Sequence, residues 1–289
     1  MIIGDFSTRC RSVYRVVGAS SCQALRQSDI MTQRPMDANE TTLVNEDRIV
    51  PYVTSSPVGS RVLVLAPHPD DESIGCGGAL LLLIKSGGAA KVVFLTKGEK
   101  ADPYCTDRER YEAMREKEGL RALRILGINE HEFLRFPDRE LFGNRETALQ
   151  RLSMIVEEFR PDTLYCPSGI ELNPDHRAAA ALALALQRMH GLVVVFYELT
   201  TPLRPHILVD ISPVYRKKKK AIKAYKSQLR LIDYLKYITC LNVFRTITLG
   251  GKASHAEAFV VCAGAADAER LPSWLGFEGV LSQKFNSSG

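Results

Sequence analysis

The sequence has no Cys-x-x-Cys pair, although it contains seven cysteines in 289 residues. They are odd in number and widely scattered, at Cys10, Cys22, Cys76, Cys105, Cys166, Cys240 and Cys262. Cysteines without paired spacing are typical of free thiols, because disulfide frameworks and cysteine-based zinc sites use regular spacings. We therefore expect free thiols in a reducing compartment.

The chain also lacks an apolar run long enough to span a membrane. Its longest candidate, roughly residues 178–200, is interrupted by Gln187, Arg188 and His190, whereas a span needs about 20 predominantly apolar residues. The charged N-terminus is not followed by the apolar stretch of roughly 7–15 residues that a secretory signal requires. These absences predict no membrane span and a cytoplasmic location.

Neither charge sign dominates, since 38 basic and 33 acidic residues give a formal net charge of +5. Nucleic-acid binders use denser basic stripes to neutralise phosphates. The densest basic cluster, at residues 216–226, includes four consecutive lysines and could meet anionic lipid or phosphate groups. A solvated helix face is the simpler interpretation, and only Tyr215 and Tyr225 lie near enough to stack on bases. We expect no nucleic-acid partner.

A complete dinucleotide fingerprint is missing as well. Gly75, Gly77 and Gly78 do not complete the pattern Gly-x-Gly-x-x-Gly, and the acidic residues before them would repel a pyrophosphate. Close packing of a helix against a sheet is the interpretation that we favour for these glycines.

The chain divides into two parts by composition. Residues 1–45 are polar and aperiodic, which predicts a partly disordered N-terminal extension. Residues 46–289 are expected to form a single domain, since a chain of this length can bury a substantial core.

Beyond residue 60, segments typical of strands and helices alternate. Strands are expected at 62–66, 92–96, 163–167 and 192–197, and helices at 73–85, 107–126, 144–160 and 177–189. This alternation predicts an α/β fold with a parallel sheet and helices on both faces. Ligand sites in such folds lie at the carboxyl ends of the strands, which directs attention to the loops at 67–72 and 168–176.

Those two loops carry the residues best suited to metal binding and catalysis. Residues 67–72 hold one imidazole and three carboxylates directly after a buried strand. Adjacent carboxylates repel one another in a folded site, and a divalent metal relieves the repulsion. The second loop adds His176 at a helix start, so His68, Asp71 and His176 could converge as metal ligands.

Three protein ligands would leave one coordination position open, as catalytic zinc sites do. Water in that position has a pKa of about 7. Asp70, next to the ligands, could then accept the proton of the attacking water and pass it to a leaving nitrogen. The alternative for Asp70 is a cap on the following helix.

Several motifs together resemble those of the PIG-L/LmbE family of zinc-dependent N-acetylglucosamine deacetylases. They are Pro67-His68-Pro69-Asp70-Asp71-Glu72, Pro174-Asp175-His176, Arg115 with Glu118 ahead of Leu126-Gly127, Tyr225-Lys226-Ser227-Gln228 and Ala256-Glu257-Ala258-Phe259. The resemblance covers roughly residues 60–262. It implies an α/β fold, a Rossmann-like three-layer sandwich with a mostly parallel sheet.

The family acts on N-acetylglucosaminyl-phosphatidylinositol, on glucosaminyl intermediates of mycothiol and bacillithiol, and on glycopeptide antibiotics. The resemblance therefore implies an amino-sugar small molecule, a glycolipid or a glycosylated metabolite as the substrate. It implies Zn²⁺ as the cofactor, although other divalent metals are possible, held by His68, Asp71 and His176, with Asp70 as the general base. An oligomer is also possible.

The resemblance further implies that Arg115 and Asp138 hydrogen-bond sugar hydroxyls. Arg115 could alternatively pair with Glu118 one helical turn later. The family usually has a histidine at the position of Asn173, where it steadies the oxyanion or helps to protonate the amine. We expect Asn173 to face the attacking water as a neutral hydrogen-bond donor, because an amide does not titrate near neutral pH.

The sequence leaves three functional hypotheses open. The leading one is a metal-dependent hydrolase that removes an N-acetyl or N-acyl group from an amino sugar. The first alternative is a carbohydrate-binding protein of the same fold whose turnover is weak or lost because of Asn173. The second, a nucleic-acid-binding accessory built on the lysine cluster, has no supporting motif.

Overall fold

A computed structural model describes residues 50–264, 266–268 and 270, all within one compact unit that spans Asn45–Gly289. The expected N-terminal extension, residues 1–45, lies outside the described residues. Its disorder therefore stays a prediction.

The described residues contain a seven-stranded sheet with the strand order β3-β2-β1-β4-β5-β7-β6. The strands are β1 (Arg61–Ala66), β2 (Ala89–Thr96), β3 (Glu130–Phe136), β4 (Thr163–Pro167), β5 (Val193–Tyr197), β6 (Ile207–Asp210) and β7 (Ala256–Cys262). The first five run parallel, whereas β7 pairs antiparallel with both β5 and β6. The expectation of a mostly parallel sheet is confirmed.

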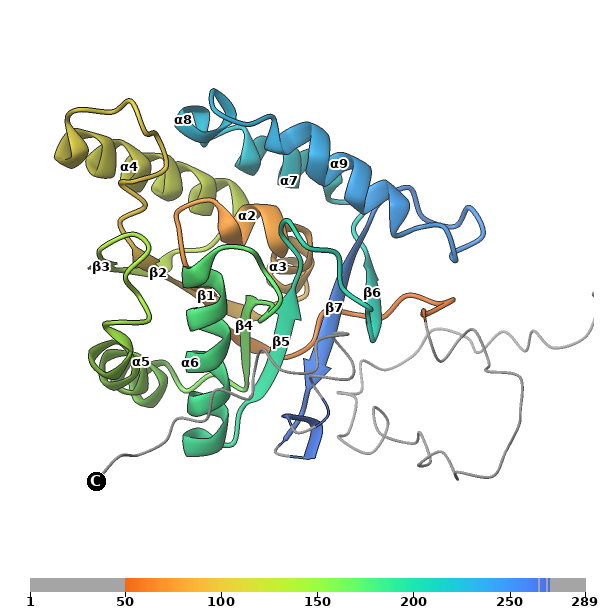
Figure 1. Ribbon diagram of the computed structural model, residues 1–289. Helices are drawn as coiled ribbons and strands as arrows, with labels where there is room; N and C mark the ends of the chain where they lie inside the picture. Colours follow the sequence, from red (N-terminus) through yellow and green to blue (C-terminus); the bar gives the residue numbers. More distant parts are fainter. Residues whose placement is uncertain (1–49, 265, 269, 271–289) are drawn as a thin grey trace, which may run out of the picture. The chain divides into compact units, whose positions relative to one another are not determined.

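Helices cover both faces of this sheet (Figure 1). They are α2 (Asp71–Gly75), α3 (Gly77–Lys85), α4 (Arg108–Leu126), α5 (Arg145–Phe159), α6 (Pro174–His190), α7 (Tyr215–Ile222), α8 (Lys226–Leu229) and α9 (Tyr234–Phe244). Successive strand side chains point to opposite faces. Accordingly Val62 and Val64 of β1 join a core with α3, α4 and α7, while Leu63 and Leu65 join a second core with α5 and α6.

The expected helix at 73–85 is in fact two helices, α2 and α3, which are separated at Cys76. The glycines around this junction allow close packing. A Cβ atom on Gly75 would lie 2.2 Å from the Tyr197 ring, and one on Gly78 would lie 2.4 Å from Ile211. The backbone N–H of Gly78 donates to Glu257 Oε1 at 2.7 Å, so a carboxylate of the chain itself occupies the start of α3.

The order of the strands creates a crevice next to β1. From β1 the chain moves outward to β2 and β3, whereas β4 and β5 lie on the other side of β1. The loops that follow β1 and β4 therefore diverge at their carboxyl ends, which is where open α/β sheets bind ligands. Both loops singled out in the sequence meet at this point.

Within the described ranges, no helix is long and apolar enough to cross a membrane.

Candidate active site

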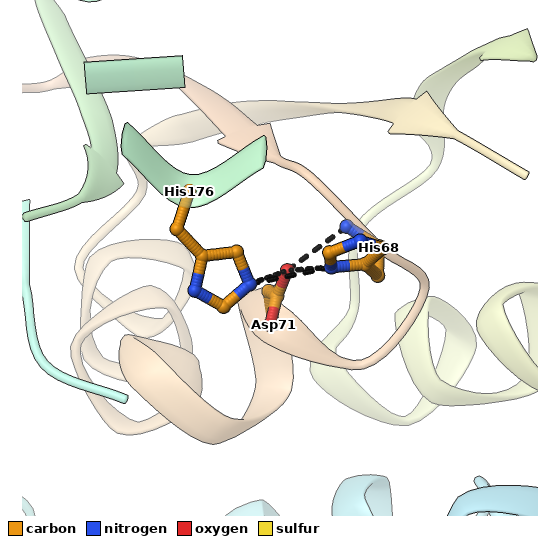
Figure 2. A group of neighbouring side chains, drawn as sticks. All are labelled: His68, Asp71 and His176. Carbon is orange, nitrogen blue, oxygen red and sulfur yellow. Dashed lines mark hydrogen bonds and ion pairs between the residues drawn. The ribbon is translucent and has the colours of Figure 1, made fainter. Parts of the chain in front are cut away.

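His68, Asp71 and His176 come together at the carboxyl ends of β1 and β4, and all three are buried (Figure 2). His68 Nδ1 lies 3.2 Å from Asp71 Oδ2 and 3.2 Å from His176 Nε2, and the third side of the triangle, His176 Nε2 to Asp71 Oδ2, is 3.3 Å. Tetrahedral ligands about 2.0–2.1 Å from a zinc ion stand roughly 3.3–3.4 Å apart. The three atoms therefore fit a divalent cation, and the donor set suits one.

The turn after β1 brings the first two of these side chains together. The backbone N–H of His68 donates to Asp71 Oδ2 at 2.9 Å, and Asp71 N donates back to His68 O at 3.3 Å. Between them, Asp70 adopts a φ of 141°, which costs a non-glycine residue conformational energy. Such strain is concentrated at functional sites. Asp70 makes no side-chain capping bond to α2, so the capping interpretation is not supported.

A second layer of carboxylates orients His68. Its Nε2 lies 3.3 Å from Asp138 Oδ1 and 3.4 Å from Asp175 Oδ2. Asp175 is fixed in turn, because it accepts hydrogen bonds from the backbone N–H groups of Arg139 at 2.6 Å and Leu141 at 3.1 Å. A proton on Nε2 facing these carboxylates leaves the Nδ1 lone pair directed at the triangle.

Glu171 lies next to His176 on the side away from the triangle, and the sequence interpretation did not include it. Glu171 Oε2 lies 3.9 Å from His176 Nδ1. Its buried carboxylate accepts hydrogen bonds from the backbone N–H groups of Leu199, Thr200 and Thr201, at 2.9–3.2 Å. The only signal for it in the sequence is an acidic residue in the loop after a predicted strand.

Arg115 supports Asp70 from the adjacent helix α4. Its Nη2 donates to the carbonyl of Pro69 at 2.6 Å and lies 3.3 Å from Asp70 Oδ1, while Nη1 donates to the carbonyl of Gly98 at 2.8 Å. Glu118 instead accepts hydrogen bonds from Ser227. The alternative of an Arg115–Glu118 pair is therefore wrong.

Burial and neighbouring charges change the pKa values of these groups. Burial raises the pKa of Asp70 to about 7, with the Arg115 guanidinium acting against the rise. Burial would also raise the pKa of Asp71, but His176 and His68 hold it well below its usual range. For His176 burial lowers the pKa, but the Asp71 charge outweighs it and raises the pKa to about 9. Without a cation, the cluster holds protons that a bound cation would displace.

The cluster opens into a cavity of about 410 Å³. The residues that line it include His68, Asp70, Asp71, Lys100, Arg115, Asp138, Asn173, His176, Gln228, Leu231, Ile232 and Tyr234. Every site residue expected from the sequence therefore borders one cavity. A volume in this range accommodates a small-molecule ligand such as one or two sugar rings.

Asn173 stands at the rim of this cavity as the N-cap of α6. Its Oδ1 accepts a hydrogen bond from the backbone N–H of Asp175 at 2.9 Å. Because the oxygen is engaged in the cap, the amide NH₂ is the group that Asn173 can offer to the cavity.

Asp138 combines two sets of contacts. Besides His68, its carboxylate accepts a hydrogen bond from the backbone N–H of Lys100 at 3.1 Å. Burial would raise the pKa of Asp138, but its hydrogen bond and charge interaction with His68 lower it to about 2. Asp138 is therefore an ionised acceptor at the cavity wall.

Comparisons with known proteins agree with this geometry. The family model for PIG-L, described as GlcNAc-PI de-N-acetylase, matches residues 63–187. The probable N-acetyl-alpha-D-glucosaminyl L-malate deacetylase 2 of Bacillus anthracis is 32% identical over 184 residues, covering 58% of this chain and 81% of that protein. The diacetylchitobiose deacetylase of Thermococcus kodakarensis is 31% identical over 193 residues, covering 58% of this chain and 70% of that protein.

The fold comparison points the same way. The solved structure of N,N'-diacetylchitobiose deacetylase from Pyrococcus horikoshii, in complex with its inhibitor, matches with a TM-score of 0.65. The match covers 75% of this chain and 90% of that chain at 24% identity, so it shows a shared fold. With the sequence relatives, the motifs and the fold all in agreement, this chain belongs to the PIG-L family.

Proposed function

We propose that this protein is a metal-dependent hydrolase that removes an N-acetyl or related N-acyl group from an amino-sugar substrate. The observation that carries the proposal is the buried triangle of His68, Asp71 and His176, with ligand atoms 3.2–3.3 Å apart, beside the carboxylate of Asp70. The relatives described above are deacetylases of amino-sugar compounds by name, which supports this substrate class.

His68, Asp71 and His176 would hold the metal ion. Two imidazoles and one carboxylate suit zinc, and such a mixed set also accepts iron, cobalt or manganese. When bound, the ion would polarise the amide carbonyl and acidify the attacking water. Asp138 and Asp175 keep the imidazole of His68 oriented, as the outer carboxylates of metal sites do.

Asp70 is assigned the proton transfers. It accepts a proton from the water whose oxygen attacks the amide carbon, and it returns that proton to the nitrogen as the C–N bond breaks. The products are a carboxylate and a free amine. The buried contact with Arg115 fixes the position of the Asp70 carboxylate beside the triangle.

Asn173, Arg115 and Asp138 are assigned to the substrate. The Asn173 amide would donate to the developing oxyanion, since its oxygen is already used in the cap of α6. Asp138 would accept from sugar hydroxyls at the cavity wall. Arg115 also lines the cavity and would donate to sugar hydroxyls.

The alternative of a carbohydrate-binding protein without efficient turnover rests on Asn173 alone. It is less favoured, because such a protein would not need the buried Asp70 beside a complete metal-binding triangle. It would nevertheless bind the same sugars, so binding alone cannot separate the two hypotheses.

Release of acetate and a free amine from an N-acetylglucosaminide separates them. The protein is loaded with zinc, assayed, treated with a chelator and reloaded. We expect equal amounts of acetate and amine, loss of both on chelation and recovery on reloading. Metal-loaded protein that binds the sugar without releasing acetate would favour the carbohydrate-binding alternative.

A further inference from the structure

The positive charge of this protein is concentrated in one segment, residues 211–256. That segment contains eleven basic residues and a single acidic residue, Asp233. The rest of the chain is left with 27 basic and 32 acidic residues, so it is acidic on balance. The modest net charge of the whole chain therefore conceals a strongly basic part, built from α7, α8, α9 and the loops around them.

Three of these basic side chains are already neutralised. Lys218 is fully buried and its Nζ lies 2.7 Å from Glu257 Oε1, which corrects the expectation that the whole lysine run is solvated. Arg245 pairs with Glu198, and Arg230 pairs with Asp102 at 3.0 Å.

Seven of the other eight basic side chains have no such partner: Arg216, Lys217, Lys219, Lys220, Lys223, Lys226 and Lys236. Six of them are exposed and Lys219 is half-buried. Across the described residues, none of the seven lies within ion-pair distance of a carboxylate.

The outer face of α9 is apolar. Tyr237 is 64% exposed, Val243 46% and Phe244 56%, and Ile247 just after the helix is 74% exposed. The helical spacing of Tyr237, Val243 and Phe244 places these three on one side of α9, opposite the buried Ile238 and Asn242. A contiguous group of large exposed apolar side chains is typical of an interaction site.

The basic and apolar groups lie on neighbouring helices. The side of α7 that faces α9 is buried, with Tyr215 Oη hydrogen-bonded to Thr239 Oγ1 and Lys218 Nζ to Asn242 Oδ1 at 3.0 Å. Both helices lie on the face of the sheet that carries α3 and α4 (Figure 1). The lysines on the solvent side of α7 and the aromatic and aliphatic side chains on that of α9 therefore lie on neighbouring helices, and the exposed Lys236 adds a positive charge to α9 itself.

We propose that this basic and apolar surface of α7–α9 docks the protein on an anionic membrane surface. Lysines beside exposed Phe, Tyr and Ile match the chemistry of a lipid interface, since ammonium groups attract anionic headgroups while apolar side chains enter the acyl boundary. Docking on the membrane surface needs no membrane-spanning helix.

Two other binding partners, a second copy of the chain and a nucleic acid, match the basic and apolar side chains of α7 and α9 less well. A second copy that used the same surface would bring two strongly basic patches together, and like charges across an interface are repulsive. A nucleic acid would match the lysines but would leave the aliphatic side chains of Val243 and Ile247 without a partner, because bases stack on aromatic rings.

Vesicle flotation tests the proposal on the full-length protein. The vesicles are phosphatidylcholine alone, or phosphatidylcholine with about a quarter phosphatidylglycerol. We expect the protein to float with the anionic vesicles only. Because each lysine near an anionic surface strengthens binding by roughly fivefold, Lys217→Gln with Lys220→Gln and Lys223→Gln should weaken it on the order of a hundredfold. Phe244→Ser with Ile247→Ser should also weaken binding.

Matched controls use exposed residues elsewhere: Lys85→Gln with Arg124→Gln and Arg188→Gln for charge, and Met154→Ser with Met189→Ser for apolar area. Both controls should float like the wild type. Wild-type protein that does not float, or controls that lose as much binding as the surface variants, would overturn the proposal. Amino-sugar turnover, measured in parallel on a soluble substrate, should be unchanged in the surface variants, so vesicle binding and the proposed activity can fail independently.

Discussion

At the residue scale, Asn173 stands where the resemblance to the family leads us to expect a histidine. Its amide can donate a hydrogen bond but cannot give up a proton near neutral pH. We therefore expect Asn173→His to raise the rate on an N-acetylglucosaminide and to add a second titration to the pH profile of kcat/KM. Both effects follow from an imidazole that can protonate the departing amine.

The variant also loses the N-cap of α6, since Asn173 Oδ1 accepts from Asp175 N. The cap contributes about 1 kcal/mol, so Asn173→His should unfold at a slightly lower temperature. Asn173→Ser is the matched control, because serine keeps the cap without supplying an imidazole. A rate and a pH profile that are identical in Asn173→His and the wild type would place Asn173 outside the reaction zone.

The metal ligands allow a second prediction at this scale. His68→Ala combined with His176→Ala should abolish stoichiometric metal binding, because only the Asp71 carboxylate of the triangle remains. Elemental content of untagged protein is the measurement. His131→Ala with His190→Ala is the control, since these residues lie away from the triangle and should leave the content near one metal per chain. Equal metal content in both double variants would contradict the assignment.

The motifs in the loops at 67–72 and 168–176 were enough to single out His68, Asp71 and His176, because these loops follow strands that are neighbours in the sheet. Arg115, Asp138 and Asn173 were expected only from the resemblance to the family. Glu171 and Asp175 were assigned no role. Their function depends on backbone N–H groups far along the chain, from Leu199 and Arg139 respectively. A single sequence contains no pattern that reports such contacts.

At the element scale, helix α3 begins on a buried ion pair. Glu257 accepts hydrogen bonds from Gly78 N and Ala79 N, both at 2.7 Å, and faces Lys218 Nζ at 2.7 Å. Removing one partner of such a pair leaves a buried charge uncompensated, at a cost of about 3–5 kcal/mol. Lys218→Met should therefore lower the free energy of unfolding by about that amount.

Chemical denaturation measures the difference, and Lys217→Met is the control. Lys217 is exposed on the same helix, so its substitution should change stability by no more than about 0.5 kcal/mol. If the two variants were equally stable, the Lys218–Glu257 pair would not contribute to the stability of the fold.

The elements up to residue 197 were largely predictable, because buried parallel strands are short apolar runs and the amphipathic helices end at Gly127 and Gly191 in left-handed conformations. The strand β3 was missed, because it lies at the sheet edge and alternates charged and apolar residues. After residue 200 only a helix in the lysine-rich run was expected, and the other elements were not predicted. There β6 is only four residues long, and the apolar side of α9 faces outward instead of inward.

At the scale of the whole molecule, the free energy of unfolding should depend on pH and on metal binding, because Asp70 and the triangle of His68, Asp71 and His176 are buried. Folding raises the pKa of Asp70 from 3.8 to about 7 and that of His176 from 6.5 to about 9. A raised pKa means that the folded chain binds more protons than the unfolded one. The stability from these groups is therefore fully present below the unfolded values and is lost as pH rises through the folded ones.

The metal-free chain should accordingly lose stability between about pH 4 and pH 9 through these two groups. Stabilisation by zinc should instead increase over the upper part of that range, because the ion must displace the proton of its ligand His176. Thermal unfolding in a chelator and in zinc, at several pH values, is the measurement. A rise in Tm on adding zinc that does not depend on pH would contradict this linkage.

The proposed activity is tested most directly at Asp70. This residue should be needed for turnover but not for metal binding. Metal content and acetate release from an N-acetylglucosaminide, measured together on the wild type and on Asp70→Asn, separate the two requirements. We expect both proteins to hold about one metal per chain, with acetate release by Asp70→Asn slower by roughly 10²–10⁴-fold, the usual contribution of a general base. Near-normal acetate release by metal-loaded Asp70→Asn would contradict the proton-transfer role on which the proposed function rests.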